Sequence, residues 1–280
     1  KDENTFYAPE GYGSWYWGEL GAKLATRLNV PILFINTAWE GLAIDAWRES
    51  LLGGTAPNPF SGLRAKPGYP YNSTRYALNY YHHLLGIRAI LWSQGESDTF
   101  INKSAQEYAN DLKLVISETR KSSAKNIAWV VSRTSKVGNR TSPDVIQGQN
   151  ITISTTQNVF PGPNLDQIED RYDGTHFNTV GLNKAADEWS IFLNDAFFNS
   201  SIPFVGTGFI EPTIKCSIES DVPIQITLNT DKKNINWSNG LKDATIFIKS
   251  GQLQAQVVDT NKNVSYSPIL FFDQNTIPQK

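Results

Sequence analysis

The sequence is short of cysteine, methionine and histidine. Its 280 residues include one cysteine, Cys216, no methionine and three histidines, His82, His83 and His176. A single cysteine excludes a disulfide framework within the chain and argues against a cysteine-bound metal cluster. Three histidines leave few side chains that could act as a catalytic base near neutral pH.

An excess of one charge and a long apolar run are also missing. The chain has 25 Lys and Arg residues against 27 Asp and Glu residues, and its net charge is -2. The basic residues are scattered, a pattern that does not indicate binding to nucleic acid or to an anionic membrane surface. No apolar stretch approaches the roughly 20 residues that cross a bilayer as a helix. We therefore expect neither nucleic acid nor a membrane as a partner.

Aromatic residues are plentiful. Eight Trp, eleven Tyr and fourteen Phe, with 40% hydrophobic and 19% charged residues, indicate a folded globular protein rather than a disordered chain. The length allows one large domain or a medium and a small one.

The first two hundred residues alternate between helix-like and strand-like patterns. Apolar residues at helical spacing predict a helix over Gly13–Asn29, and a short run rich in branched residues predicts a buried strand over Val30–Ala38. Further predicted elements are helix Arg75–Leu85, strand Ile87–Gln94, helix Ser104–Thr119, strand Ile127–Ser132, helix Ser142–Thr155, and helix Asn178–Phe198, which Asn178 or Thr179 could cap. This alternation predicts an α/β fold whose parallel sheet is covered on both faces.

The pattern changes after Ser201. Short alternating segments occur at Ile224–Leu228, Ala244–Ile248, Leu253–Val258 and Val264–Phe272, and turn-forming stretches at Ser238–Gly240 and Asp259–Asn263 separate some of them. They predict a small antiparallel β-sandwich of immunoglobulin-like type. The expected domains are therefore residues 1–201 and residues 206–280.

Polar or glycine-containing clusters follow the predicted strands, where ligands bind in open parallel sheets. Gln94 and Glu96 are two residues apart and would share one face of an extended strand. The Gln94 amide and the backbone N–H of Gly41 could donate to a developing oxyanion. The ordinary alternatives are a turn glycine at Gly41 and, at Glu96, a structural carboxylate that accepts hydrogen bonds from backbone amides or from His82.

Asp173 and His176 form the most specific of these clusters. An Asp three residues before a His on a turn can place its carboxylate beside the imidazole ring. The carboxylate then fixes the tautomer and stabilises the imidazolium that forms when His accepts a serine proton. The alternative is a plain Asp-Gly turn with a polar His near the start of a helix.

Three blocks together carry a family resemblance: INTAWEGLAIDAW at Ile35–Trp47, LWSQGESD at Leu91–Asp98 and DGTHFNTVG at Asp173–Gly181. In order and separation they resemble the sialate O-acetylesterase-like and acetylxylan esterase-like carbohydrate esterases of the SGNH hydrolase superfamily. The resemblance covers about residues 10–198. It is far more specific than any one block alone.

The resemblance implies a flavodoxin-like three-layer sandwich with a Ser-His-Asp site. His176 and Asp173 match the family's histidine and aspartate. The oxyanion donors would be the N–H of the nucleophile, the N–H of Gly41 and the side chain of Gln94, and Glu96 is similar to a carboxylate that supports the site. No metal or organic cofactor is implied.

Two features depart from the family pattern. The family usually has two adjacent glycines where this chain has Glu40 and Gly41. The nucleophile block is not found in these residues, and Ser14 resembles a position downstream of the nucleophile. We therefore expect an interior strand between the Val30 and Ile87 strands, contributed with the nucleophilic serine by a separate N-terminal segment.

The expected function is hydrolysis of acetyl esters on the hydroxyl groups of a carbohydrate such as sialic acid or a plant polysaccharide. A noncatalytic carbohydrate-binding protein that keeps the hydrolase fold is the alternative. A glycosidase using Glu96 and Asp173 is weaker because it leaves His176 and Gln94 without roles. The sandwich resembles modules appended to secreted bacterial glycan-degrading enzymes, which implies a secreted or periplasmic location.

Overall fold

The computed structural model describes residues 14–82, 85–123, 125–206, 213–217, 224–230, 234–248, 251–258, 264–267 and 270–272. The chain divides into two compact units. The first consists of residues 1–77 and 87–204, and the second of residues 78–86 and 205–280. We call them unit 1 and unit 2.

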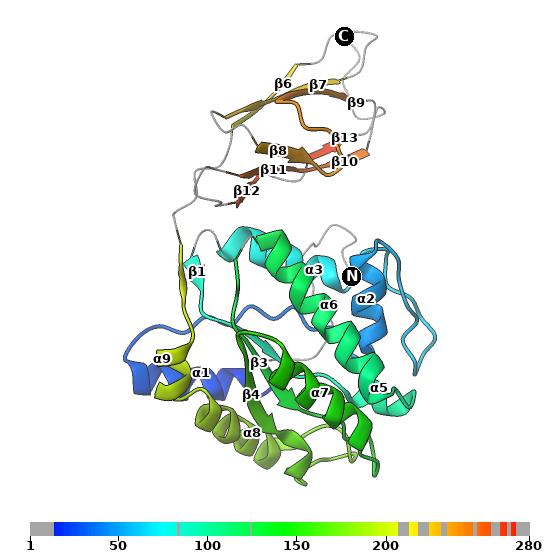
Figure 1. Ribbon diagram of the computed structural model, residues 1–280, viewed down its shortest axis with the longest axis vertical. Helices are drawn as coiled ribbons and strands as arrows, with labels where there is room; N and C mark the ends of the chain where they lie inside the picture. The colour runs from blue at the N-terminus through cyan, green and yellow to red at the C-terminus, as the bar shows by residue number, and fades with distance from the viewer. Residues whose placement is uncertain are drawn as a thin grey trace. The chain divides into compact units, whose positions relative to one another are not determined.

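A parallel sheet lies at the centre of unit 1 (Figure 1). It contains β2 (Ile90–Trp92), β3 (Trp129–Arg133) and β4 (Val159–Asn164) in the order β2-β3-β4. Ile90 pairs with Trp129, and Trp129 pairs with Val159. The parallel strands and the helices between them confirm the predicted α/β class.

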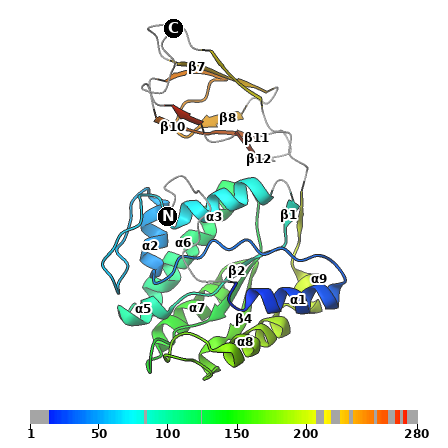
Figure 2. The same cartoon turned by 180° about the vertical axis from the view of Figure 1, so that it is seen from behind.

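Helices cover both faces of this sheet (Figures 1 and 2). Val130 of β3 is buried with residues of α1 (Trp17–Leu28) and α8 (Thr179–Phe192). Its neighbours Trp129 and Val131 are buried with residues of α2 (Ile44–Leu51), α6 (Ala105–Ser123) and α7 (Pro143–Thr155). Successive side chains of a strand point to opposite faces, so unit 1 has three layers.

Several predicted elements of the first 206 residues have different bounds. The helix predicted over Arg75–Leu85 consists of α3 (Tyr71–Ala77) and the π-helical η1 (Leu78–His82). The remaining short elements of the first 206 residues are β1 (Gly86–Ile87), α5 (Glu96–Phe100), η2 (Leu165–Gln167), α9 (Asp195–Ser200) and β5 (Phe204–Val205), and β1 pairs with β5.

The long helix predicted over Asn178–Phe198 is two helices, α8 and α9. Asn178 caps α8, because its side chain accepts a hydrogen bond from Gly181 N at 3.0 Å. The chain leaves the helix at Leu193, and the Asn194 side chain caps α9 by accepting from Phe197 N at 3.1 Å. Asparagine favours such a cap over a helix interior, since its side chain competes for backbone N–H groups.

The prediction of a strand at Val30–Ala38 is wrong for the residues that the structure describes. These residues form an extended segment between α1 and α2 that is not part of a sheet, drawn as a coil in Figure 2. Ile32 and Phe34 pack against the core beside α1, whereas Leu33 and Ile35 are exposed. The alternation typical of a strand is present, but a strand also needs a neighbour to pair with.

Strand β4 was missed by the sequence analysis because it contains Pro161 and Pro163. Proline cannot donate to a sheet ladder, and it is therefore found at edges of sheets. In the described part of the sheet β4 pairs with β3 alone, so its prolines face no partner strand on the other side.

Unit 2 contains antiparallel strands: β6 (Thr213–Ser217), β7 (Ile224–Asn229), β8 (Asn234–Trp237), β9 (Thr245–Ile248), β10 (Gly251–Leu253), β11 (Ala255–Val258), β12 (Val264–Tyr266) and β13 (Leu270–Phe272). They pair as β6-β7-β9, β12-β11-β8 and β10-β13. Ile226, Trp237 and Val257 from the two larger sheets belong to one buried core.

This core indicates two sheets packed together, and the immunoglobulin-like type remains a prediction. The strand predicted over Val264–Phe272 is two strands, and the turn predicted at Asp259–Asn263 lies outside the described residues. The turn at Ser238–Gly240 is present, with Gly240 at φ +88°. Among the described residues, no helix combines the length and apolarity that a membrane crossing requires.

Candidate active site

Three of the predicted site residues, Gln94, Asp173 and His176, lie after strands of one parallel sheet. Gln94 follows β2 by two residues, and the loop that carries Asp173 and His176 follows β4 and η2. Parallel strands end at the same edge of a sheet, and this edge is where open α/β sheets bind ligands.

Asp173 and His176 are in direct contact. Asp173 Oδ2 lies 2.6 Å from Nδ1 of the His176 ring, and Asp173 Oδ1 accepts hydrogen bonds from the backbone N–H groups of His176 at 2.7 Å and Thr175 at 2.8 Å. The His176 side chain is 41% exposed, so a reactant can reach the ring. The Nδ1 contact holds the tautomer in which Nε2 can accept a proton.

The Asp173 carboxylate stays ionised in this arrangement. Partial burial raises the pKa of Asp173, but the backbone and ring hydrogen bonds from His176 and the N–H of Thr175 outweigh it and lower this pKa to about 2. Hydrogen bonds donated to the charged form of a carboxyl group have this effect. The carboxylate is therefore available to stabilise an imidazolium at His176.

A close approach of two loops shapes this turn. Gly174 has φ +80°, and a Cβ at this position would lie 2.9 Å from the backbone of Gly138. Glycine adopts this left-handed conformation without strain and leaves room for the neighbouring chain. Thr175 Oγ1 accepts a hydrogen bond from Gly138 N at 2.7 Å and joins the two loops.

Arg171 stabilises the same loop through hydrogen bonds to backbone carbonyl groups. Its guanidinium donates to the carbonyl oxygens of Leu165 at 2.8 Å, Ile168 at 2.9 Å and Thr175, and it lies 4.1 Å from the centre of the Phe177 ring. Sequence analysis did not identify Arg171. Its position two residues before Asp173 was the only local signal, because its acceptors are backbone carbonyls that a sequence pattern does not reveal.

Both the nitrogen and the oxygen of the Gln94 side-chain amide form hydrogen bonds. Gln94 Nε2 donates to Leu42 O at 3.1 Å and to Asp98 Oδ2, and Gln94 Oε1 accepts from Tyr108 Oη at 3.1 Å. Both amide hydrogens thus have acceptors within the chain. To stabilise an oxyanion, Gln94 would have to exchange one of these bonds for a bond to the substrate.

Gly41 lies next to this network, because its neighbour Leu42 accepts the Gln94 bond. Gly41 has φ +69°, and a Cβ there would lie 2.5 Å from Asn58 Nδ2. The residue is therefore a constrained turn glycine, as the ordinary alternative held.

The position of Glu96 differs from the prediction. We expected Gln94 and Glu96 to share a strand face, but β2 ends before Gln94, and Glu96 is the first residue of α5. The chain departs from the strand at Gly95, where a Cβ would lie 2.0 Å from Thr134 O. Only glycine fits so close to the backbone that follows β3.

The Glu96 side chain is turned toward its own backbone. Its Oε2 accepts a hydrogen bond from Gly95 N at 3.1 Å, as a structural carboxylate would. Burial raises the pKa of Glu96, the negative charge of Asp166 raises it further, and Arg171 lowers it. The charge of Glu96 thus interacts with that of Arg171, whose hydrogen bonds stabilise the loop of Asp173 and His176.

Asp98 is a fully buried carboxyl group that the sequence analysis left without a role. It accepts hydrogen bonds from Ile44 N, at 3.2 Å to each oxygen, and from Gln94 Nε2. It therefore ties the end of β2 to the first turn of α2. Burial raises the pKa of Asp98 to about 7, although the bonds from Gln94 and Ile44 N oppose this rise.

We expect Asp98→Asn to change how stability depends on pH. The carboxyl titrates at about 7 in the folded chain but at the ordinary value of 3.8 when unfolded, so the folded state binds more protons between these values. The stabilising contribution of Asp98 is complete below pH 3.8 and is lost as the pH rises through 7. The free energy of unfolding of Asp98→Asn should therefore rise relative to the parent from about pH 4 to about pH 7. Urea unfolding at several pH values measures this difference, and a constant difference would contradict the assignment.

Ser14, which resembles a family position downstream of the nucleophile, precedes α1 and is exposed, and its carbonyl accepts a hydrogen bond from Trp17 N at 3.1 Å. Ser93 at the end of β2 accepts a bond from Tyr16 Oη at 2.8 Å. Among the described residues, no serine hydroxyl is hydrogen-bonded to the His176 ring. The described residues also contain no group of three or more His, Cys, Asp or Glu side chains arranged to hold a metal ion.

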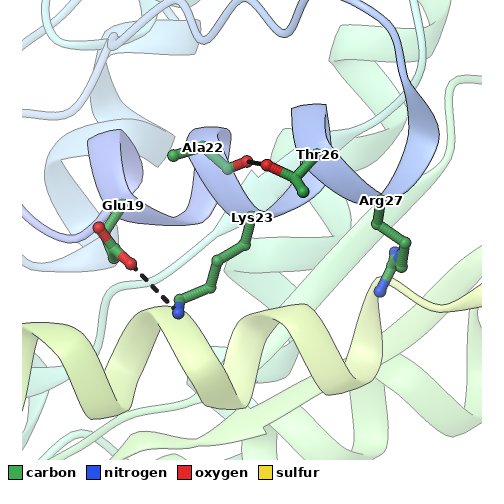
Figure 3. Close-up of a pocket in the computed structure, with 5 residues that line it drawn as sticks. All are labelled: Glu19, Ala22, Lys23, Thr26 and Arg27. Carbon is green, nitrogen blue, oxygen red and sulfur yellow. Dashed lines mark hydrogen bonds and ion pairs between the residues drawn. The ribbon is translucent and has the colours of Figure 1, made fainter.

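A shallow pocket on α1 is separate from these residues (Figure 3). Lys23 in this pocket contacts Glu19 at 3.1 Å and Asp187 at 2.9 Å, and Arg27 donates to Ser190 O at 3.1 Å. The bonds to Asp187 and Ser190 hold α1 to α8. The pocket therefore belongs to the packing of two helices and contains no residue of the predicted site.

Comparisons with known proteins identify a family for this chain. A family model described as "SASA: Carbohydrate esterase, sialic acid-specific acetylesterase" matches residues 18–189, which is more than half of the chain. The crystal structure of a protein from Arabidopsis thaliana is similar at 16% identity over 70% of this chain and 73% of that chain, with a TM-score of 0.47. So distant a likeness carries no argument about fold or function. No curated protein matches the chain.

Proposed function

Because the chain belongs to the carbohydrate esterase family of sialic acid-specific acetylesterases, we propose that it hydrolyses acetyl esters on sugar hydroxyl groups by a Ser-His-Asp mechanism. The contact between Asp173 Oδ2 and His176 Nδ1 is the observation that carries this proposal. It supplies an oriented base at the ligand-binding edge of the sheet. The substrate is an acetylated carbohydrate, and the mechanism uses no metal or organic cofactor.

The chemistry follows from the orientation of His176. A serine Oγ attacks the acetyl carbonyl carbon while Nε2 takes the hydroxyl proton, and the resulting imidazolium is stabilised by Asp173. The tetrahedral intermediate collapses as Nε2 returns the proton to the departing sugar oxygen. Water then attacks the acyl-enzyme with His176 again as base, the bond to the serine Oγ breaks as His176 returns the proton to that oxygen, and acetate leaves. Gly41 N–H and Gln94 Nε2 are the proposed donors to the oxyanion, and Glu96 supports the site through the loop braced by Arg171.

The extended segment Val30–Ala38 supports a proposal about the serine. Leu33 is 64% exposed and Ile35 is 40% exposed, and in the described part of the chain no strand pairs with this segment. We place a further parallel strand beside it, contributed by a segment outside the described residues. In a parallel sheet that strand would end at the same edge as β2 and β4 and deliver a serine there.

The domain boundaries and the location remain proposals. Residues 1–201 form the esterase domain, and residues 206–280 form an accessory immunoglobulin-like sandwich. Such an accessory module suits a bacterial enzyme that is secreted or periplasmic and acts on glycans.

Acetate release and covalent labelling test the proposed function together. We expect the protein to release acetate from O-acetylated xylan fragments or O-acetylated sialic acid and to leave the matching unacetylated glycosides intact. A fluorophosphonate should stop this reaction by modifying one serine, which peptide mass spectrometry identifies. Modification of Ser14 would contradict the proposed strand. Absence of both acetate release and labelling, with sugar binding retained, would favour the noncatalytic carbohydrate-binding alternative.

A further inference from the structure

Two aromatic side chains flank the His176 ring. The Tyr172 ring is stacked on it, with centroids 5.6 Å apart and an angle of 15° between the planes. The Trp15 ring stands nearly perpendicular to it, at 6.2 Å and 84°. Tyr172 is 68% exposed and Trp15 is 36% exposed, so both present apolar surface to solvent beside the proposed base.

The surrounding structure holds these rings in place. Tyr172 N donates to His176 O at 3.0 Å, which fixes Tyr172 on the same loop as the base. Trp15 has φ +52°, a left-handed conformation that bulky residues rarely adopt, and its ring lies 6.1 Å from that of Phe177. Backbone strain of this kind persists where neighbouring contacts enforce it, often at binding sites.

The charged side chains around the loop that carries Asp173 and His176 bear on whether a neutral or an anionic ligand can bind there. Asp173 is ionised and lies against His176. The cationic side chains of Lys136 and Lys184 are paired with Glu169 and Asp170, and Arg171 donates to backbone carbonyls. An anionic sugar would meet the carboxylate of Asp173 and would have to compete for cations that already have partners.

We propose that Trp15 and Tyr172 form a subsite for the pyranose ring that bears the acetyl group, and that this subsite takes a neutral sugar in preference to an anionic one. The inference rests on the proposed function and names its substrate class. The C–H face of a pyranose covers an aromatic ring while its hydroxyl groups remain free to hydrogen-bond. Aromatic surfaces with a few polar groups line ligand sites for this reason.

Binding of uncleavable analogues tests the subsite without requiring catalysis. The neutral probes are methyl xylosides in which an acetamido group replaces the acetyl ester at each ring position in turn. The anionic probe is N-acetylneuraminic acid with an acetamido group at C9. Calorimetry should show the parent binding at least one xyloside more tightly than the anionic probe. Binding of neither probe, or tighter binding of the anionic one, would overturn the proposal.

Variants of Tyr172 separate a sugar contact from a positioning role. Tyr172→Ala should weaken xyloside binding about tenfold, which corresponds to about 1.4 kcal/mol, whereas Tyr172→Phe should stay within about twofold of the parent. Phe247→Ala removes an exposed aromatic ring from β9 of unit 2 and is the matched control. Thermal unfolding verifies that each variant is folded.

Two results have different meanings for the subsite and for the reaction. If Tyr172→Ala binds the xyloside as the parent does but hydrolyses phenyl acetate more slowly, the ring only positions His176 and the subsite is wrong. If the parent and Tyr172→Ala differ in sugar binding but neither releases acetate, the proposed esterase activity fails while the subsite stands.

Discussion

His176→Ala is expected to lower acetate release by about 100-fold or more, the usual cost of losing a general base. His176 is exposed, and its ring contacts Asp173, Tyr172 and Trp15 at the loop surface rather than in the core. The variant should therefore keep the melting temperature of the parent within a few degrees. Initial rates of acetate release from an acetylated sugar, measured beside thermal unfolding, provide the test.

A matched pair of aspartate variants sharpens this result. Asp173→Asn removes the carboxylate that contacts the ring and should reduce turnover strongly, because the amide no longer stabilises the imidazolium. Asp170→Asn changes a carboxylate on the same loop that pairs with Lys184 at the surface, and it should leave turnover near the parental rate. Activity of His176→Ala within about tenfold of the parent would exclude His176 as the base.

Gln94→Ala is expected to lower turnover by about 100- to 1000-fold, the usual loss for one oxyanion donor. The expectation requires that a Gln94 N–H moves from Leu42 O or Asp98 to the substrate in the transition state. Because such a bond forms as charge develops, kcat should fall more than KM rises. Steady-state kinetics on an acetylated sugar measure both values.

The hydrogen bonds of Gln94 also predict what a structural role would look like. Truncation leaves Asp98 Oδ2 and Leu42 O without this donor, which lowers stability whether or not Gln94 acts in catalysis. Gln106→Ala is a suitable control, since Gln106 bonds Asn110 at 2.8 Å on the exposed face of α6. A destabilised Gln94→Ala with unchanged turnover would assign Gln94 to scaffolding alone.

Local patterns predicted much of unit 1 correctly. Helix α1 follows from apolar spacing, helices α6 and α7 overlap helices that were predicted at nearly the same bounds, and a strand overlapping β3 was predicted over Ile127–Ser132. Prediction from local patterns fails where contacts between residues distant in sequence decide the structure. The prolines of β4 prevented its prediction as a strand, although prolines occur in edge strands. The strand-like alternation of Val30–Ala38 does not produce a strand, because pairing depends on neighbours that are distant in sequence.

The sequence by itself determined the α/β class and the Asp173–His176 contact, because both depend on short spacings: strand and helix periods in one case, and an i, i+3 turn with a glycine in the other. Only the tertiary structure decided the environment of that pair. It directs the amide of Gln94 to the backbone carbonyl of Leu42 and brings Trp15 to a ring that lies far along the chain. These contacts join segments whose separation is set by how helices pack on a sheet, which no local pattern of residues encodes.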